Sequence, residues 1–436
     1  MVHVKERQTA SVLSSKILDL LAEYNVPVDH IWSVTVDNGA NMLAAVKKLQ
    51  NEIQIAIIET LEDDDMDDLE PQFDITAALT AELQERINLV RCAVHTLQLA
   101  ILDVVDKSHP KVSSLTDLAK KVKNIKYKTN FDHHGASHPP IWSQTRWGGI
   151  FEMVQSFHSQ KSFFEQLAIQ FPELDLSNHW SFIDSYYDAF KPLYLCTKKM
   201  QEHHVSLSDF YIAWLMAMSE VRKCTVNSFV PALLNSLKTR LSALRNSRAF
   251  KISLYLDPRI NYHGSTFFSP QEKVEIQGYI NETWQRIRQL QSTSLTPNMT
   301  NEAFIESENN DDFDAYLTEM FGGSVDTESS SETKFLQQLQ SLDLEPRQNH
   351  SFDIWNHWVS RKTTHPELYA VAMVVLATPS NQVSVERSFS ALGLILTNRR
   401  TNLGENTLSN ILMVKLNKDL FQEAISSAYN WKDLNR

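Results

Sequence analysis

Residues 31–39 read IWSVTVDNG, and this short stretch decides the fold class. The run from Ile31 to Val36 is apolar and rich in β-branched residues, which is typical of a buried strand. It stops abruptly at Asp37-Asn38-Gly39, and residues 40–58 then have helical periodicity. A strand that ends in a polar loop before a helix is typical of an α/β sheet, which presents its reactive groups at such loops.

The rest of the chain has mainly helical patterning. Residues 87–105 predict a second strand that runs into a helix near His95, and residues 180–295 are almost wholly helical apart from YLDPRI at 255–260. Glycine is scarce, at 10 of 436 residues, so few positions suit the turns of a hairpin-rich all-β fold. We therefore expect a mainly helical α/β protein.

Two acidic stretches account for the negative charge. The chain has 41 Lys+Arg and 53 Asp+Glu, a net charge of −12. Residues 59–70 hold eight acids and residues 302–332 hold ten, and neither stretch contains Lys or Arg. The remainder is mildly basic, so the total charge does not exclude phosphate binding. The lysines between 120 and 128 fit that function, but a lysine run is also typical of a solvated helix face.

Cysteine and hydropathy exclude several classes of protein. Three scattered cysteines without C-x-x-C spacing exclude a disulfide framework and a two-cysteine zinc finger. The longest apolar run, residues 368–377, is too short to cross a bilayer. The first thirty residues lack the features of a signal peptide. We expect an intracellular soluble protein that has no membrane partner.

Several residues have chemistry that permits two interpretations. Asp37 follows a buried strand, where a carboxylate ligates Mg²⁺ or simply caps the next helix. Cys92 and His95 form a C-x-x-H pair, which supplies two metal ligands or a buried thiol beside a hydrogen-bonded imidazole. Glu386 begins a helix, where a carboxylate also complements the helix dipole.

Arg146 and Trp147 form an adjacent cationic and aromatic pair before a predicted helix. Arginine binds phosphate, and tryptophan stacks on an extruded base. The alternative is a Trp that anchors the core with the Arg on its rim.

Six phrases in order resemble the hAT family of DNA transposases and the host proteins descended from them. They are TVDNGANM (35–42), RCAVHTLQLA (91–100), TRWGGIFEM (145–153), YLDPRI (255–260), WNHW with HPELYAVAMVVLATPSNQVSVERSFSALGLI (355–358 and 365–395), and TNRRTNLGENTLSNILMVKL (397–416). Residues 379–416 resemble the family's C-terminal dimerisation region, which is its most specific signature.

The resemblance implies a ribonuclease-H-like fold with a large helical insertion. We expect a partial ribonuclease-H-like domain at 1–180 with an acidic loop at 59–70, an all-helical insertion at 181–295 and an acidic disordered linker at 296–345. Residues 346–436 would be the dimerisation region, which completes the first domain. The family's first strands lie before the DNGANM block, and this chain begins only 36 residues before Asp37. We therefore expect the chain to lack those strands and the BED-type zinc finger.

The resemblance also assigns residues to functions. Family members cut DNA at a two-metal site held by Asp, Asp and Glu. Asp37 resembles the second Asp and Glu386 the Glu, and Mg²⁺ or Mn²⁺ is expected only if the protein is active. DNA contacts are expected from Arg146, Trp147, Lys120, Lys121 and Lys123, and the motif near the site is formed by Cys92 and His95. The expected dimerisation face comprises Phe389, Leu392, Ile395, Leu408, Ile411, Leu412 and Leu416.

These expectations favour a nuclear, non-catalytic transposase-like protein that self-associates and contacts DNA, with no small-molecule substrate. One alternative is an active transposase whose first Asp and zinc finger are missing from this sequence. Another is a helical scaffold that binds a partner through its acidic linker.

Overall fold

The computed structural model describes residues 9–50, 87–106, 108–142, 147–201, 205–293, 331–396, 404–418 and 420–426. The predicted acidic loop 59–70, Arg146 and most of the predicted linker lie outside these residues. The described chain is mainly helical with a small sheet, which confirms the expected class.

The sheet consists of two parallel strands, β1 (Ser33–Val36) and β2 (Asn88–Arg91). They pair in register from Ser33 with Asn88 to Val36 with Arg91. The side chains of Val36 and Val90 are fully buried, because both faces of the pair are covered by other elements.

Helices make up nearly all of the remaining described structure. Before and after the strands lie α1 (Ala10–Glu23), a helix over residues 40–50, α4 (Ala93–Leu102), α5 (Pro110–Lys121), α6 (Ile125–His134), α7 (Gly148–Ser159) and α8 (Lys161–Gln170). The centre contains α9 (Trp180–Met200), α10 (Leu207–Lys223), α11 (Val230–Arg245), α12 (Arg248–Tyr255) and α13 (Pro270–Thr293). The C-terminal part contains α15 (Ser331–Ser341), α16 (Ile354–Ser360), α17 (Pro366–Leu376), α18 (Val383–Ile395) and α19 (Glu405–Leu416). Short 3₁₀ turns lie at Val28–His30, Pro172–Leu174 and Leu342–Leu344.

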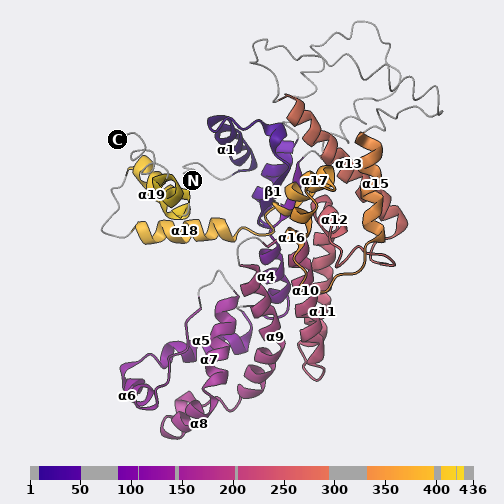
Figure 1. Cartoon of the computed structure of the whole chain (residues 1–436). Coiled ribbons are helices and arrows are strands. Elements are labelled where there is room, and N and C mark those ends of the chain that lie inside the picture. Colours follow the sequence, from indigo (N-terminus) through magenta and orange to yellow (C-terminus); the bar gives the residue numbers. More distant parts are fainter. Residues whose placement is uncertain are drawn as a thin grey trace, which may run out of the picture.

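One hydrophobic core joins β2 and the helices from α4 to α17, from Val90 to Leu376, and a smaller cluster around Leu49 and Ile87 joins α1 to the first strand. The long helix α9 packs against both α7 and α10, and α11 packs against α4. Stacked rings fill the α7–α9 contact, where the centroids of Phe151 and Tyr194 lie 4.4 Å apart. Figure 1 shows α5 to α8 as a lobe below the strands, with α10 to α17 beside them.

Helix α15 lies inside the stretch that the sequence predicts as linker, 296–345. Its Phe335 is fully buried and stacks on Trp284 of α13, with the ring centroids 4.3 Å apart. Leu339, one turn later, is also buried. The acidic stretch is therefore followed by a helix that belongs to the core.

The chain returns to the first strand before α18. Thr35 donates from Oγ1 to the carbonyl oxygen of Pro379 over 2.7 Å, and the backbone N–H of Ala93 donates to the carbonyl oxygen of Ser380 over 2.9 Å. These contacts place the start of α18 beside the carboxyl ends of β1 and β2.

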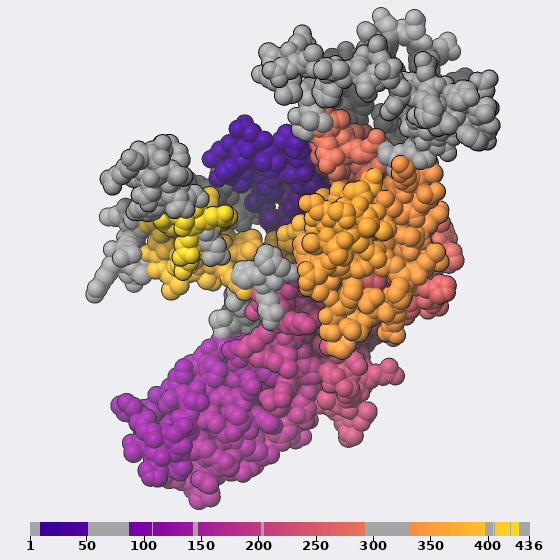
Figure 2. Space-filling view, viewed as in Figure 1, coloured from indigo at the N-terminus to yellow at the C-terminus, as the bar shows by residue number. Residues whose placement is uncertain are grey.

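Helices α18 and α19 form a hairpin, here called the arm, that projects away from the rest of the molecule (Figure 1). The arm has its own small core, in which the buried residues that the structure describes are Ala391, Ile395 and Leu412. Figure 2 shows it as a separate lobe beside the main body. Across the described ranges, none of the helices is both long enough and apolar enough to cross a bilayer.

Candidate functional site

Asp37 lies directly after β1 and shapes the loop that leads to the helix at 40–50. Its Oδ1 accepts a hydrogen bond from the backbone N–H of Gly39 over 2.9 Å, which closes a tight turn. A Cβ at position 39 would lie 2.8 Å from that oxygen, so a larger residue there would displace the Asp37 carboxylate. Next to it, Asn38 donates to Thr96 Oγ1 over 3.1 Å and ties the loop to α4.

Cys92 lies between β2 and α4, and its backbone N–H donates to the carbonyl of Val36 over 2.7 Å. Burial is the largest influence on the thiol and raises the pKa of Cys92, although the backbone N–H of His95 opposes it. A buried thiol with a raised pKa stays protonated and is a weak metal ligand. His95 lies in the first turn of α4 and is half-buried.

Glu386 lies in the first turn of α18 and is exposed. Its backbone N–H donates to the carbonyl of Gln382, whose side chain donates to the carbonyl of Thr35, so the first turn of α18 lies at the edge where the strands end. The structure therefore brings Asp37, Cys92 and Glu386 to the same edge of the strand pair.

The two carboxylates are the donor type that Mg²⁺ and Mn²⁺ prefer, but a two-metal site needs more than two protein ligands. Among the residues that the structure describes, no group of three or more His, Cys, Asp or Glu side chains is arranged to hold a metal ion. The described residues therefore do not fit the full set that the resemblance implies.

Trp147 lies in the main core with 3% of its surface exposed. Its ring meets that of Tyr194 edge-on, with the centroids 6.1 Å apart, and Phe151 packs beside both. The structure thus places Trp147 where the core-anchor interpretation puts it. Arg146 lies outside the described residues.

The predicted DNA-contacting lysines lie at the end of α5 and just after it, and all three are exposed. Lys120 pairs with Asp117 at 3.2 Å, and Lys121 donates to the carbonyl of Glu173 over 3.2 Å. Lys123 lies in the turn between α5 and α6.

A neighbouring charge pair was not among the candidates from sequence. Lys126 Nζ lies 2.6 Å from Glu173 Oε1, and Tyr127 donates to the same oxygen over 3.0 Å. The Lys126 contact is the main reason why the pKa of Glu173 falls to about 2. No sequence signal joins these residues, because Glu173 lies two helices later.

The predicted dimerisation face divides into two groups. Ile395 and Leu412 are buried inside the arm, and Leu392 and Leu408 pack against them. Phe389, Ile411 and Leu416 are 57%, 38% and 46% exposed. Further exposed apolar residues on the arm and on the residues that follow α19 are Val385, Leu394, Leu396, Met413, Val414, Leu420, Phe421 and Ile425.

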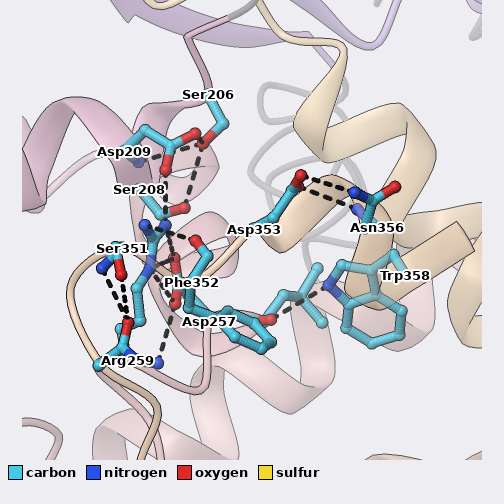
Figure 3. A network of polar contacts seen from close by, with 12 residues as sticks. Ser206, Ser208, Asp209, Asp257, Arg259, Ser351, Phe352, Asp353, Asn356 and Trp358 are labelled. Atoms are coloured by element: carbon cyan, nitrogen blue, oxygen red, sulfur yellow. Dashed lines mark hydrogen bonds and ion pairs between the residues drawn. The ribbon is translucent and has the colours of Figure 1, made fainter. Parts of the chain in front are cut away.

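A buried charge network around Arg259 joins the start of α10 to the residues before α16 (Figure 3). The Arg259 guanidinium contacts Asp257 at 2.5 Å and Asp209 at 2.7 Å, and donates to the carbonyl of Phe352 over 3.3 Å. Burial opposes the charge of Arg259, but the two carboxylates outweigh it and raise the pKa of the guanidinium. Asp257 is completely buried.

This network is connected to the start of the arm through α10. Ser206 caps α10 by accepting from the Asp209 N–H over 3.1 Å and donates to the Asp209 carboxylate over 2.8 Å. The carbonyl of the preceding residue, Val205, accepts a hydrogen bond from Ser380 Oγ over 2.8 Å. A cavity of about 300 Å³ lies here, between Trp355, Pro379 and Arg387.

Comparison with known proteins identifies the C-terminal part. Residues 332–417 match the hAT family C-terminal dimerisation region. Over 350 residues the chain is 24% identical to the human (Homo sapiens) zinc finger BED domain-containing protein 4. The alignment covers 73% of this chain but only 29% of that protein, so the chain spans less than a third of this relative. Residues 332–417 are therefore similar to the C-terminal dimerisation region of the hAT family.

Proposed function

We propose that this protein is a transposase-related chain that self-associates through the arm, helices α18 and α19. One observation carries the proposal: apolar side chains such as Phe389, Leu394 and Met413 are exposed on both helices within the matched region. A contiguous exposed apolar surface is typical of an interaction site. Among the described residues of the arm, its core holds three buried side chains, so contact with a second copy would add apolar burial.

Two differently tagged full-length copies, expressed together, test this proposal. We expect one tag to retain the other copy. Phe389→Asp combined with Leu394→Asp should abolish that retention, because both side chains are exposed and a charge there opposes a dry interface. Val226→Asp is the matched control, since Val226 is 99% exposed on the loop between α10 and α11. Retention that survives the double substitution would contradict the proposal.

We propose further that this chain does not itself cleave DNA strands. The Asp37–Gly39 hydrogen bond supports this assignment, because it uses one carboxylate oxygen of Asp37 to close the turn after β1. The alternative is an active enzyme, which the position of Glu386 beside the ends of the strands favours. Nicking of duplex DNA that requires Mg²⁺ or Mn²⁺ and disappears in Asp37→Asn would establish the alternative.

We propose also that the protein binds DNA and is located in the nucleus. The exposed lysines at 120, 121 and 123 support DNA contact, because phosphate binding depends on such cations. We expect binding to weaken steeply with salt, and Lys123→Glu to reduce both the affinity and the salt dependence. A fluorescent fusion that stays outside the nucleus would contradict the location.

The ribonuclease-H-like fold also remains part of the proposal. The parallel pair β1–β2, followed by α4 and contacted by residues 379–382, supports it. An experimental structure tests it: β1 and β2 paired in parallel with residues 379–382 against them is the expected result, and a different pairing would contradict the fold.

A further inference from the structure

Helices α10 and α11 are antiparallel neighbours with a groove of about 510 Å³ between them. On α10 the lining residues are Leu215, Met218, Ser219 and Arg222, which have the spacing of one helix face. On α11 they are Leu234, Asn235 and Lys238. Two helix faces that line one groove suit the packing of a third helix.

The groove has an apolar floor and a cationic rim. Leu215, Met218 and Leu234 supply the floor, and Arg222 and Lys238 are the charged residues of the lining. Neither cation forms an ion pair with a described residue. Nearby cations are different, since Lys223 pairs with Glu220 at 2.6 Å and Arg240 pairs with Asp103 at 2.7 Å.

One stretch of this chain has the complementary chemistry. Residues 311–321 read DDFDAYLTEMF and are followed by Gly322-Gly323. The apolar residues recur at the spacing of one helix face: Phe313, Tyr316, Leu317, Met320 and Phe321. The acids lie between or before them, and the glycines suit a helix end. The stretch lies outside the described residues, so the pattern is a sequence prediction of an acidic amphipathic helix.

We propose that the α10–α11 groove binds residues 311–321 of a second copy of this chain. The apolar face would cover the floor, and the acids would pair with Arg222 and Lys238. The occupant is a second copy, because the stretch is attached at both ends to its own chain far from that chain's groove. Its attachment points are Thr293 of α13 and Ser331 of α15. Figure 1 shows the end of α13 at the top of the molecule, whereas the α10–α11 hairpin reaches into its lower half. The ten residues from Phe321 to Ser331 span at most about 36 Å. This short tether holds the stretch near the start of α15, on the opposite side of the molecule from the groove of the same chain (Figure 1).

This inference rests on the proposed self-association, which supplies the second copy. The contact is electrostatic at its rim and exposed to solvent, so salt weakens it more than it weakens an apolar arm contact. It gives the acidic stretch a defined partner surface.

Carbodiimide cross-linking of the full chain tests the proposal, because this reagent joins an ammonium directly to a carboxylate with which it is in contact. Natural-abundance and ¹⁵N-labelled chains are mixed and allowed to exchange before reaction. We expect Lys238 to be joined to Asp311, Asp312, Asp314 or Glu319, with mixed-isotope peptides that mark a link between chains. The Lys223–Glu220 pair is the internal control and should give links within one chain only.

Arg222→Glu should reduce the Lys238 links at least about fivefold, whereas Lys191→Glu, on the surface of α9, should leave them unchanged. Sedimentation of the same samples separates the two proposals. A dimer that gives no link from Lys238 to residues 311–319 overturns the groove inference alone, and so do links found only within one chain. A monomer overturns the proposed self-association.

Discussion

Gln382 donates from Nε2 to the backbone carbonyl of Thr35 over 3.0 Å, and so joins positions 347 residues apart in the sequence. The bond fastens the start of α18 to strand β1. With the Thr35–Pro379 and Ala93–Ser380 bonds, it fixes the arm to the same edge of the sheet that carries Asp37. The direction in which the arm projects is therefore set at the strands.

Replacing Gln382 with Ala should loosen this attachment. The substitution removes one hydrogen bond and leaves the Thr35 carbonyl without that donor, which costs about 0.5–1.5 kcal/mol. Hydrogen exchange measured by mass spectrometry should become faster in peptides that contain Cys92 and Ala93. Gln166→Ala, on the exposed side of α8, is the control. Unchanged exchange in these peptides would contradict the assigned role.

Loss of Arg259 should be the most damaging change among the buried charges. Arg259→Met leaves the carboxylate of Asp257 buried without its partner, and breaking such a pair typically costs about 3–5 kcal/mol. Arg259→Lys should recover only part of this, since an ammonium cannot contact Asp257, Asp209 and the Phe352 carbonyl in the same geometry. Urea unfolding followed by tryptophan fluorescence measures both. A loss below about 1 kcal/mol for Arg259→Met would contradict the network.

The two interpretations of Trp147 separate by substitution. Because the ring is buried against Tyr194 and Phe151, Trp147→Ala should cost about 3–5 kcal/mol, and Trp147→Phe much less. Thermal unfolding measures the stability. If Trp147 also handled a base, Trp147→Phe would lose DNA binding while remaining folded. Equal DNA affinity for the wild type and Trp147→Phe is the result expected of a core anchor.

His357 should make the protein less stable in mild acid. Burial, assisted by the nearby Arg361, lowers the pKa of His357 from 6.5 to about 4. Between those two values the unfolded chain binds a proton that the folded chain does not, so stability falls as the pH falls, by at most about 1.4 kcal/mol per unit. Above pH 6.5 this contribution is complete. Urea unfolding at pH 4.5 to 7.5 should show a smaller pH dependence for His357→Gln, and an identical dependence would contradict the assignment.

Sequence periodicity was sufficient for the class and for the elements near the site. The run Ile31 to Val36 predicted β1, because a β-branched run that ends at Asp-Asn-Gly has few other structures available. It also predicted the arm's apolar residues. It did not separate those inside the arm, such as Ile395, from those on its surface, such as Phe389, because both lie on apolar helix faces. That division depends on how α18 packs against α19.

The ion pairs could not be predicted from the sequence either, because they too depend on how the helices pack. Asp257 and Arg259 are two residues apart in YLDPRI, yet Asp209 and Phe352 come from distant parts of the chain. Only the packing of α10 beside residues 350–353 brings them together. Phe335 likewise shows that a helix of the core follows directly after an acidic stretch, which composition alone did not indicate.

Sedimentation velocity across about 1–50 µM protein tests the central claim, self-association through the arm, most directly. The chain has a mass of 50.0 kDa, and the wild type should sediment at twice that mass with increasing concentration. Phe389→Asp should shift the equilibrium to the monomer without lowering the melting temperature, because the side chain is exposed. A wild type that remains at 50.0 kDa across the whole range would contradict the account.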